Sequence, residues 1–158
     1  MIAVYAGSFD PVTVGHWDII QRSSKLFGGL IVGVGTNSAK SPLLTAGERQ
    51  MLIKEACADL ENIKVDIFSG LLVEYCKSVG AEVIVRGLRA VSDFEAELAM
   101  AHVNYMLNPN IETVFLDTKA SNSFISSSMV KEIARNNGDF SKLVPKNVES
   151  YITRKLRG

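Results

Sequence analysis

A strand-to-helix turn near the start of the chain is rich in residues suited to phosphate chemistry. Residues 7–11 read Gly-Ser-Phe-Asp-Pro and residues 13–16 read Thr-Val-Gly-His, directly after a short apolar run. Gly7 would let the backbone approach a ligand closely, and Ser8 adds a hydroxyl and an amide beside it. His16 is expected on the first turn of the following helix, where N–H groups and the helix dipole favour an anion. The structural alternative is a tight turn in which the histidine only caps a helix, and it explains fewer of these residues.

Two arginines lie at the predicted carboxyl end of a later strand. Residues 86–89 read Arg-Gly-Leu-Arg. Guanidinium groups fork onto phosphate oxygens, so Arg86 and Arg89 are candidates for binding a phosphate group. The alternative is a pair of surface arginines that form ion pairs with Asp93 or Glu95 of the next helix.

A serine-rich segment follows the last predicted strand. Residues 121–128 read Ser-Asn-Ser-Phe-Ile-Ser-Ser-Ser, and the helix after them carries Lys131. Hydroxyls beside the free amides of a helix N-terminus form a cradle for phosphate. The alternative is a helix cap in which one serine hydroxyl caps the helix and the other serines are incidental.

A fourth polar loop, residues 37–42, follows another predicted strand and contains Lys40. Its lysine is placed to fold across the same edge of the sheet, although a lone loop lysine is more often simply solvated. His102 falls within a predicted helix and is interpreted as structural, and Trp17 is interpreted as a packing residue.

These four segments share one kind of chemistry. The chain has no acidic cluster that would cage a metal, and the isolated Asp10 and Asp117 do not form one. It also lacks a P-loop and a nucleophile-elbow string. Cations and amide donors without a protein nucleophile indicate phosphoryl or nucleotidyl transfer by positioning and charge stabilisation. The substrate would supply the attacking oxygen, and magnesium would be carried on nucleotide phosphates.

Alternating strand and helix patterns must bring these segments together. Short apolar runs predict strands that are covered on both faces, namely Ile2–Ala6, Leu30–Val34, Ile63–Phe68, Val83–Val85 and Thr113–Leu116. Helical spacing predicts the segments His16–Phe27, Thr45–Ala58, Leu71–Val79, Asp93–Leu107, Ser127–Asn136 and Pro145–Leu156. Gly80 and Gly138 are expected to end helices.

This alternation predicts a doubly wound, Rossmann-like α/β fold with a five-stranded parallel sheet and helices on both faces. Residues 1–158 are expected to form a single nucleotidyltransferase domain, because no linker or repeat divides them. In such folds ligands bind beyond the carboxyl ends of the strands, which is where the polar segments are expected to meet.

Composition narrows the possible partners. The 158 residues include 17 Lys and Arg against 17 Asp and Glu, so bulk charge favours neither a nucleic acid nor a membrane. No segment approaches a membrane span, and the N-terminus has no signal-peptide pattern. Cys57 and Cys76 show no metal-ligand spacing and are interpreted as small buried hydrophobic residues, which suits a reducing cytoplasm.

Over essentially its whole length the chain resembles the phosphopantetheine adenylyltransferase family of the nucleotidyltransferase superfamily. The strings that carry the resemblance are G-S-F-D-P, T-x-G-H, R-G-L-R-A-V-x-D-F-E and S-F-I-S-S-S. The resemblance implies adenylyl transfer from ATP to 4′-phosphopantetheine, which gives dephospho-coenzyme A and pyrophosphate, with Mg2+ bound through the ATP phosphates. It also implies a cytoplasmic homohexamer in which coenzyme A competes at the site as a feedback ligand.

Matching the motifs residue by residue implies a role for individual side chains. His16 would stabilise the transition state at the α-phosphate, and Lys40 would be the second catalytic residue. The expected phosphopantetheine contacts are Ser8, Lys40, Leu72 and Arg86. The expected ATP contacts are Ser8, Phe9, His16, Gly87, Leu88, Arg89, Glu97, Asn122, Ser123, Phe124, Ile125, Ser126, Ser127 and Ser128. No residue is expected to bind a metal directly.

Two positions depart from the family pattern, and two other functions stay open. Ala6 stands where many relatives have proline, and Asn122 stands where many have an aromatic residue, so a ring contact near the nucleotide is not implied. A sister enzyme acting on nicotinamide mononucleotide, or with CTP on an alcohol phosphate, would share T-x-G-H but lack the long arginine string. A non-catalytic nucleotide-binding module would not need His16 or Lys40. For the transferase, we expect direct in-line attack by the acceptor phosphate, because no activated protein nucleophile is present.

Overall fold

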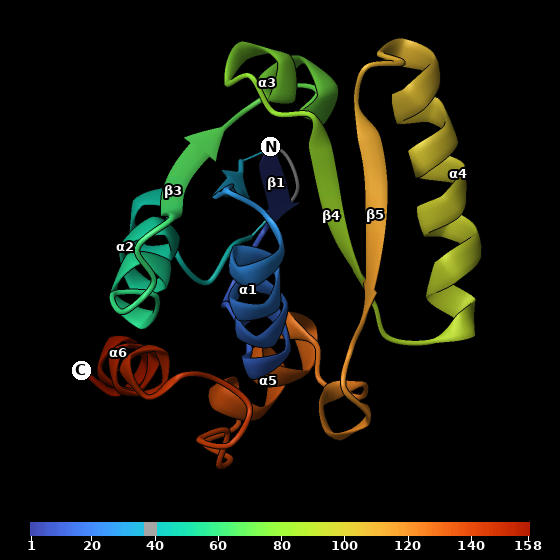
Figure 1. Ribbon diagram of the computed structural model, residues 1–158. Coiled ribbons are helices and arrows are strands. Elements are labelled where there is room, and N and C mark those ends of the chain that lie inside the picture. The colour runs from blue at the N-terminus through green and yellow to red at the C-terminus, as the bar shows by residue number, and fades with distance from the viewer. Residues whose placement is uncertain (37–40) are drawn as a thin grey trace.

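The computed structural model describes residues 1–36 and 41–158 of the chain. Its centre is a five-stranded parallel sheet in the order β3-β2-β1-β4-β5 (Figure 1). The strands are β1 (Ile2–Gly7), β2 (Gly29–Gly35), β3 (Ile63–Phe68), β4 (Val83–Leu88) and β5 (Glu112–Asp117). The chain fills the sheet in one direction from β1 and then in the other from β4. The carboxyl ends of these two neighbouring strands therefore mark the crevice where such sheets bind ligands.

Helices cover both faces of the sheet, as predicted. Tyr5 of β1 packs into the core on one face, whereas Val4 and Ala6 pack into the core on the other. The first face carries α1 (Val14–Leu26), α2 (Ala46–Ala56), α5 (Ser127–Arg135) and α6 (Lys146–Arg157). The second face carries α3 (Leu72–Ser78). It also carries α4 (Val91–Leu107), whose Phe94 packs against Phe115 of β5, and a short 3-10 helix, η1 (Ala120–Asn122), follows β5. The continuously apolar strand sequences are explained by this double cover.

Most strand and helix boundaries moved by only a few residues, and one shift concerns the site. The predicted strand Val83–Val85 continues to Leu88, because Arg86, Gly87 and Leu88 keep pairing with residues of β5. Arg86 is therefore part of the strand ladder of β4, whereas the predicted strand ended one residue before it. The helix expected from Asp93 begins earlier, at Val91.

The two glycines predicted to end helices behave differently. Gly80 takes a left-handed conformation with φ 69° after α3, as a C-terminal stop should. The prediction for Gly138 is wrong in detail, because Asn137 adopts the left-handed conformation after α5, with φ 58°. The N–H of Gly138 instead closes the helix end by donating to the carbonyl of Ile133 at 2.8 Å.

Two further expectations concern the burial of the two cysteines and the lack of a membrane-spanning segment. Cys57 and Cys76 are both buried and free, as expected of small hydrophobic residues. Burial raises the pKa of each thiol to about 11, so both stay protonated at neutral pH. In residues 1–36 and 41–158, no helix has the length and apolar character needed to cross a membrane.

Candidate active site

A cavity of about 720 Å³ opens at the carboxyl edge of the sheet. Its wall comes from the β1–α1 turn, the ends of β2, β3 and β4, the first half of α4 and the segment between β5 and α5. Lining residues that were expected to bind substrate are Ser8, Phe9, His16, Leu72, Arg86, Gly87, Arg89, Glu97, Asn122, Ile125, Ser126, Ser127 and Ser128. Leu88, Ser123 and Phe124 are not part of this wall, and Lys40 lies outside the described residues.

The β1–α1 turn is built around the ring of Phe9. This residue has φ 50°, which is uncommon outside glycine and has to be stabilised by its surroundings. Its ring packs edge-on against Tyr5 at 5.4 Å and against His16 at 5.1 Å. A Cβ on Gly7 would lie 3.2 Å from this ring, so the glycine is needed for packing as well as for the expected close approach of a ligand.

His16 sits on the first turn of α1 and is fixed through one ring nitrogen. Thr13 caps the helix, and its backbone N–H donates to Nδ1 of His16 at 3.0 Å. Because Nδ1 accepts this bond, the neutral ring carries its proton on Nε2. Burial lowers the pKa of His16 to about 4, and the positive charges of Arg89 and Arg86 add to the effect. The geometry therefore supplies a neutral N–H donor beside the cavity.

Arg86 and Glu97 form a two-pronged ion pair across the cavity wall. Nε and Nη2 of Arg86 each donate to a carboxylate oxygen of Glu97 at 2.7 Å, and Nη1 donates to the carbonyl of Ala6 at 3.0 Å. A guanidinium has five N–H groups, so two remain for a ligand. Glu97 was expected to contact ATP. In the structure it lies on α4 and fixes the orientation of the Arg86 guanidinium. This pairing differs from the sequence alternative, which proposed Asp93 or Glu95 as the acid.

Arg89 links the two sides of the cavity. Its Nε lies 3.4 Å from Asp93 in the first turn of α4, which is the acid that the sequence alternative named. Its Nη1 donates to the carbonyl of Ile125 at 3.3 Å. Arg89 therefore contacts the segment between β5 and α5, and its half-exposed head keeps N–H groups free of these two contacts.

The serine-rich segment ends in a capped helix N-terminus that faces the cavity. The hydroxyl of Ser126 accepts the N–H of Met129 at 3.2 Å, which makes Ser126 the cap of α5. Ser127 donates to the carbonyl of Pro11 at 2.8 Å and so binds α5 to the β1–α1 turn. The three serines therefore have different roles. Ser126 caps α5, Ser127 connects α5 to the β1–α1 turn, and Ser128 lines the cavity in the first helical turn. The cap alternative is correct for Ser126 and does not describe the others.

The cavity wall beside the end of β3 is apolar. Sequence reasoning identified only part of this wall. Leu72 was expected there, but Phe68 and Gly70 line it as well. Phe68 stacks on Tyr75 at 4.7 Å, and Gly70 has φ 82°. A glycine two residues after the end of a strand was the available signal for this second turn. Phe68 and Leu72 give this part of the wall an apolar surface.

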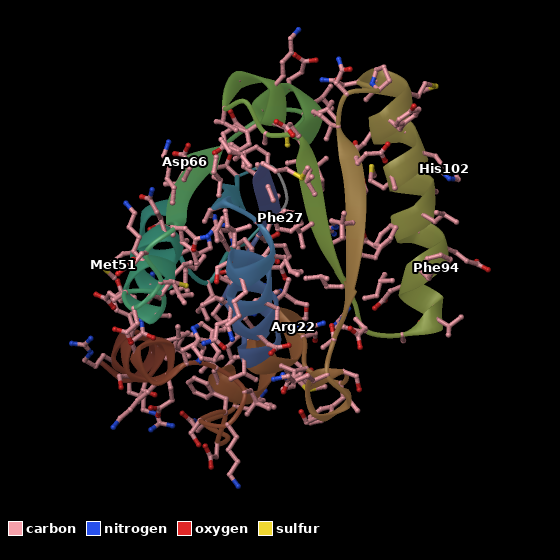
Figure 2. All side chains as sticks on the ribbon, in the orientation of Figure 1. Arg22, Phe27, Met51, Asp66, Phe94 and His102 are labelled. Carbon is pink, nitrogen blue, oxygen red and sulfur yellow. The ribbon has the colours of Figure 1, made fainter. Side chains whose placement is uncertain are left out.

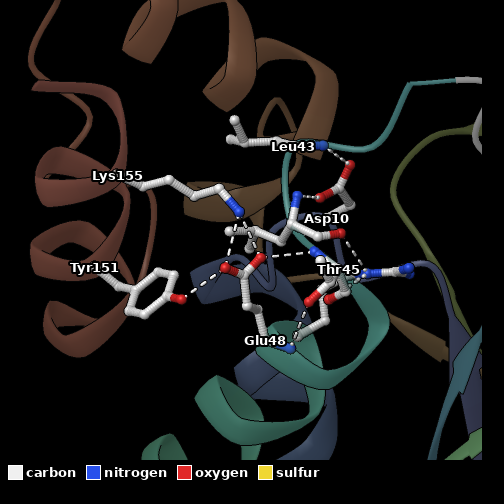
Figure 3. Close-up of polar contacts among 8 residues, drawn as sticks. Asp10, Leu43, Thr45, Glu48, Tyr151 and Lys155 are labelled. Atoms are coloured by element: carbon white, nitrogen blue, oxygen red, sulfur yellow. Dashed lines mark hydrogen bonds and ion pairs between the residues drawn. The ribbon is translucent and has the colours of Figure 1, made fainter. Parts of the chain in front are cut away.

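Two buried residues that sequence reasoning missed hold the turn in place. Asp10 accepts the N–H groups of Leu43 and Leu44 at 3.0 and 2.8 Å (Figure 3). It also pairs with Lys131 of α5 at 3.3 Å. Arg49 of α2 donates to the carbonyls of Ser8 and Gly35 at 2.7 and 3.1 Å. Both make contacts far apart in the sequence, which explains why motif spacing did not reveal them.

The described residues contain no group of three or more His, Cys, Asp or Glu side chains that could hold a metal ion. The acids that line the cavity, Asp93 and Glu97, are each paired with an arginine. This donor set fits a metal that arrives already bound to a triphosphate.

Amide, hydroxyl and guanidinium donors surround one crevice at the carboxyl edge of a parallel α/β sheet, an arrangement typical of nucleotide-binding domains. Residues 4–133 match the cytidylyltransferase-like family model. A phosphopantetheine adenylyltransferase from Synechococcus sp. (strain JA-3-3Ab) is 54% identical over 99% of this chain and 98% of its own. The enzyme of that name from Caldanaerobacter subterraneus subsp. tengcongensis is 52% identical over the same shares. The chain therefore belongs to the phosphopantetheine adenylyltransferase family.

Solved structures agree on the fold. A bifunctional NMN adenylyltransferase/ADP ribose pyrophosphatase from Francisella tularensis aligns with a TM-score of 0.77 at 13% identity. The alignment covers 99% of this chain and 50% of that one. At this identity the likeness confirms the Rossmann-like architecture and carries no statement about the substrate.

Proposed function

We propose that the protein transfers the adenylyl group of ATP to 4′-phosphopantetheine, forming dephospho-coenzyme A and pyrophosphate. The observation that carries this proposal is one cavity that brings together His16, two arginines and the N-terminus of α5. The names and high identity of the full-length relatives support the choice of acceptor. The ATP phosphates would lie against these donors, and the acceptor would extend toward Leu72 and Phe68.

His16 acts in this mechanism as a neutral donor. Its Nε2–H would hydrogen-bond an α-phosphate oxygen as negative charge grows there in the transition state. Thr13 holds the ring in the productive tautomer through Nδ1. Burial beside Arg86 and Arg89 keeps the ring uncharged, so Nδ1 can accept from Thr13 while Nε2–H donates.

The two arginines would neutralise the phosphates of both substrates. The two free N–H groups of Arg86 would bind the phosphate of the acceptor, while Glu97 holds the guanidinium plane in position. Arg89 would bind the ATP phosphates beside Ile125. Lys40 is proposed to contact the acceptor phosphate on the family resemblance. Magnesium would be held by the triphosphate and would neutralise charge there as pyrophosphate leaves.

We infer direct in-line attack of the acceptor phosphate on the α-phosphorus. Thr13, whose hydroxyl lies 3.2 Å from Nδ1 of His16, is only 2% exposed and already accepts the backbone N–H of that residue, so it is not an accessible nucleophile. A phosphate monoester is already an anion near neutral pH and needs no strong base. An ATP made chiral at the α-phosphorus should give product with inverted configuration. Retention, or label left on denatured protein, would show an adenylylated enzyme instead.

We propose that the protein assembles with copies of itself, as a hexamer on the family resemblance. All 17 residues of α4 are described, and Asn104 is the one that is buried. Val91, Met100 and Met106 are each more than half exposed on this helix. Exposed apolar side chains that recur along one helix support an interaction surface there. Coenzyme A as a competing ligand and a cytoplasmic location, which the two free buried cysteines support, belong to the same proposal.

The deciding experiment measures pyrophosphate release with ATP and 4′-phosphopantetheine. Parallel reactions replace the acceptor by nicotinamide mononucleotide, or supply CTP with an alcohol phosphate. We expect release only with the first pair. Release with either other pair would assign a sister activity. ATP binding without release from any acceptor would assign a nucleotide-binding module.

A further inference from the structure

Four charged residues outside the cavity wall connect α1 to the segment that follows β5. Arg22 of α1 donates to the carbonyl and to a carboxylate oxygen of Asp117, at 2.6 and 2.8 Å. Arg22 also pairs with Asp18 of the same helix at 3.2 Å, and Lys119 reaches the other carboxylate oxygen of Asp18 at 2.9 Å. Figure 2 shows Arg22 on α1 near the carboxyl end of β5. Charge alternates along this chain of contacts, from Asp117 through Arg22 and Asp18 to Lys119.

The network lies at the start of the proposed nucleotide segment, residues 118–128. Asp117 and Lys119 flank Thr118, whose side chain lines the cavity and whose N–H donates to the carbonyl of Leu88 at 2.7 Å. Asp18 lies two residues after His16 on the same rigid helix. The contacts therefore set where the nucleotide segment begins relative to the proposed catalytic imidazole.

Burial distinguishes this network from ordinary surface ion pairs. The side chain of Asp18 is only 7% exposed, whereas that of Lys119 is 63% exposed. A carboxylate this deeply buried needs its cationic partners, because an unpaired charge there is strongly unfavourable. Arg22 and Lys119 contact different carboxylate oxygens of Asp18. The segment after β5 is therefore held against α1 at this residue. An exposed pair without such an anchor would contribute little.

We propose that Asp18 and Lys119, together with Arg22, are positioning residues that hold the nucleotide segment in place against α1. ATP affinity then depends on contacts that ATP itself does not make. The inference rests on the proposed function, because it assigns residues 118–128 to the nucleotide. Neither Lys119 nor Arg22 lines the cavity, so both act through the segment that they fasten.

The test compares steady-state kinetics of Asp18→Asn, Lys119→Met and Arg22→Met with Lys64→Met as the control. Lys64 is matched to Lys119 in exposure, at 66%, and forms an ion pair with Asp66 away from the cavity. We expect each of the three variants to raise the KM for ATP roughly fivefold, as loss of a partly buried ion pair would. The kcat at saturating ATP and the KM for phosphopantetheine should stay within about twofold of the wild type. The control should change none of these constants.

A second comparison separates positioning from direct contact. If Lys119 bound ATP itself, Lys119→Met would raise the KM for ATP, but Asp18→Asn would free the lysine and leave that KM unchanged or lower. Under the proposal, Asp18→Asn raises the KM for ATP. The double variant Asp18→Asn/Lys119→Met then has a KM for ATP no higher than that of the more affected single variant. Should Asp18→Asn fail to fold, Arg22→Met decides, because a residue outside the wall affects ATP only through the segment. An active wild type with unchanged KM in Arg22→Met overturns this inference, whereas an inactive wild type overturns the proposed function.

Discussion

One ring nitrogen of His16, Nδ1, is hydrogen-bonded within the protein, and the other, Nε2, is left for a substrate. Thr13 donates its backbone N–H to Nδ1 and accepts the backbone N–H of His16 on its own hydroxyl, a reciprocal capping box. A helix cap thus also selects the tautomer of the proposed catalytic ring. The two sequence interpretations of this histidine, cap and phosphate ligand, are compatible because they use different nitrogens.

His16→Ala should lower kcat by about a hundredfold or more while leaving the fold and most ATP affinity intact, as loss of one transition-state donor does. The other histidine, His102, lies exposed on the side of α4 away from the sheet, so His102→Ala is the control (Figure 2). Turnover and calorimetric ATP binding are measured together. A normal kcat with weakened ATP binding would make His16 a ground-state ligand.

The ring of His16 should stay neutral in the free protein down to about pH 5, because burial near Arg89 and Arg86 lowers its pKa to about 4. Unfolding exposes the ring and returns its pKa to the ordinary value near 6.5. Between these values the unfolded chain takes up a proton that the folded protein does not. The His16 contribution to stability is therefore full above pH 6.5 and declines toward pH 4. Nitrogen-15 NMR should show the proton on Nε2 from pH 8 to 5, and a titration near pH 6.5 would contradict this.

At the scale of elements, the N-terminus of α2 is a junction between the site and the C-terminal helix. Glu48 closes a capping box with Thr45 and also accepts from Tyr151 at 2.7 Å and Lys155 at 2.6 Å, both on α6 (Figure 3). The next residue, Arg49, donates to the carbonyl of Ser8. Lys155 therefore holds the last helix against the start of α2.

Glu48→Gln should destabilise the protein by about 1 kcal/mol at pH 7, because glutamine keeps the cap but loses the ion pair. Burial acts to raise the pKa of Glu48, but Lys155, Tyr151 and the Thr45 amide outweigh it and lower the pKa to about 2. The stabilising effect is thus complete above pH 4.5 and is lost as pH falls toward 2. Urea unfolding of the variant and wild type should converge at low pH. The exposed Glu61→Gln is the control, and a gap that persists at pH 2 would refute the linkage.

Two glycines offer a matched test of backbone conformation. Neither Gly47 in α2 nor Gly80 after α3 would bring an added Cβ within 4 Å of another group, but only Gly80 has a left-handed φ, at 69°. Gly47→Ala should therefore stabilise the protein by about 0.5 kcal/mol through lower unfolded-state entropy. Gly80→Ala should destabilise it by about 1 kcal/mol. Thermal unfolding of both variants checks the signs, and equal shifts would contradict the argument.

At the scale of the whole molecule, the outer surface of α4 should set the assembly state. Met106 is 74% exposed on this helix, so Met106→Asp should shift sedimentation toward smaller species by charging an apolar contact surface. Circular dichroism should remain that of the wild type. The control is Leu26→Asp on α1, which is 62% exposed outside this surface. An assembly unaffected by Met106→Asp would remove α4 from the proposed interface.

Elements and their order were predictable where local physics decides them. Every predicted strand and helix exists, because continuous apolar runs and helical spacing are properties of neighbouring residues. Boundaries moved where pairing across the sheet prevailed over local pattern. Residues 86–88 stay extended because β5 offers them a ladder, which no local signal reveals. Most expected ligands that the structure describes line one cavity, since the carboxyl ends of parallel strands share one edge.

The sequence by itself determined the fold class, the family and the phosphate-suited turns, because each is written in short strings of adjacent residues. Only the tertiary structure decided which charges work together. Arg86 pairs with Glu97 and not with Glu95, which is nearer to it in the sequence. Asp10 pairs with Lys131, and Asp18 pairs with Lys119. These partners meet only through the packing of separate elements. Ion pairs depend on distance and burial in three dimensions, and a list of residues contains neither until the chain is folded.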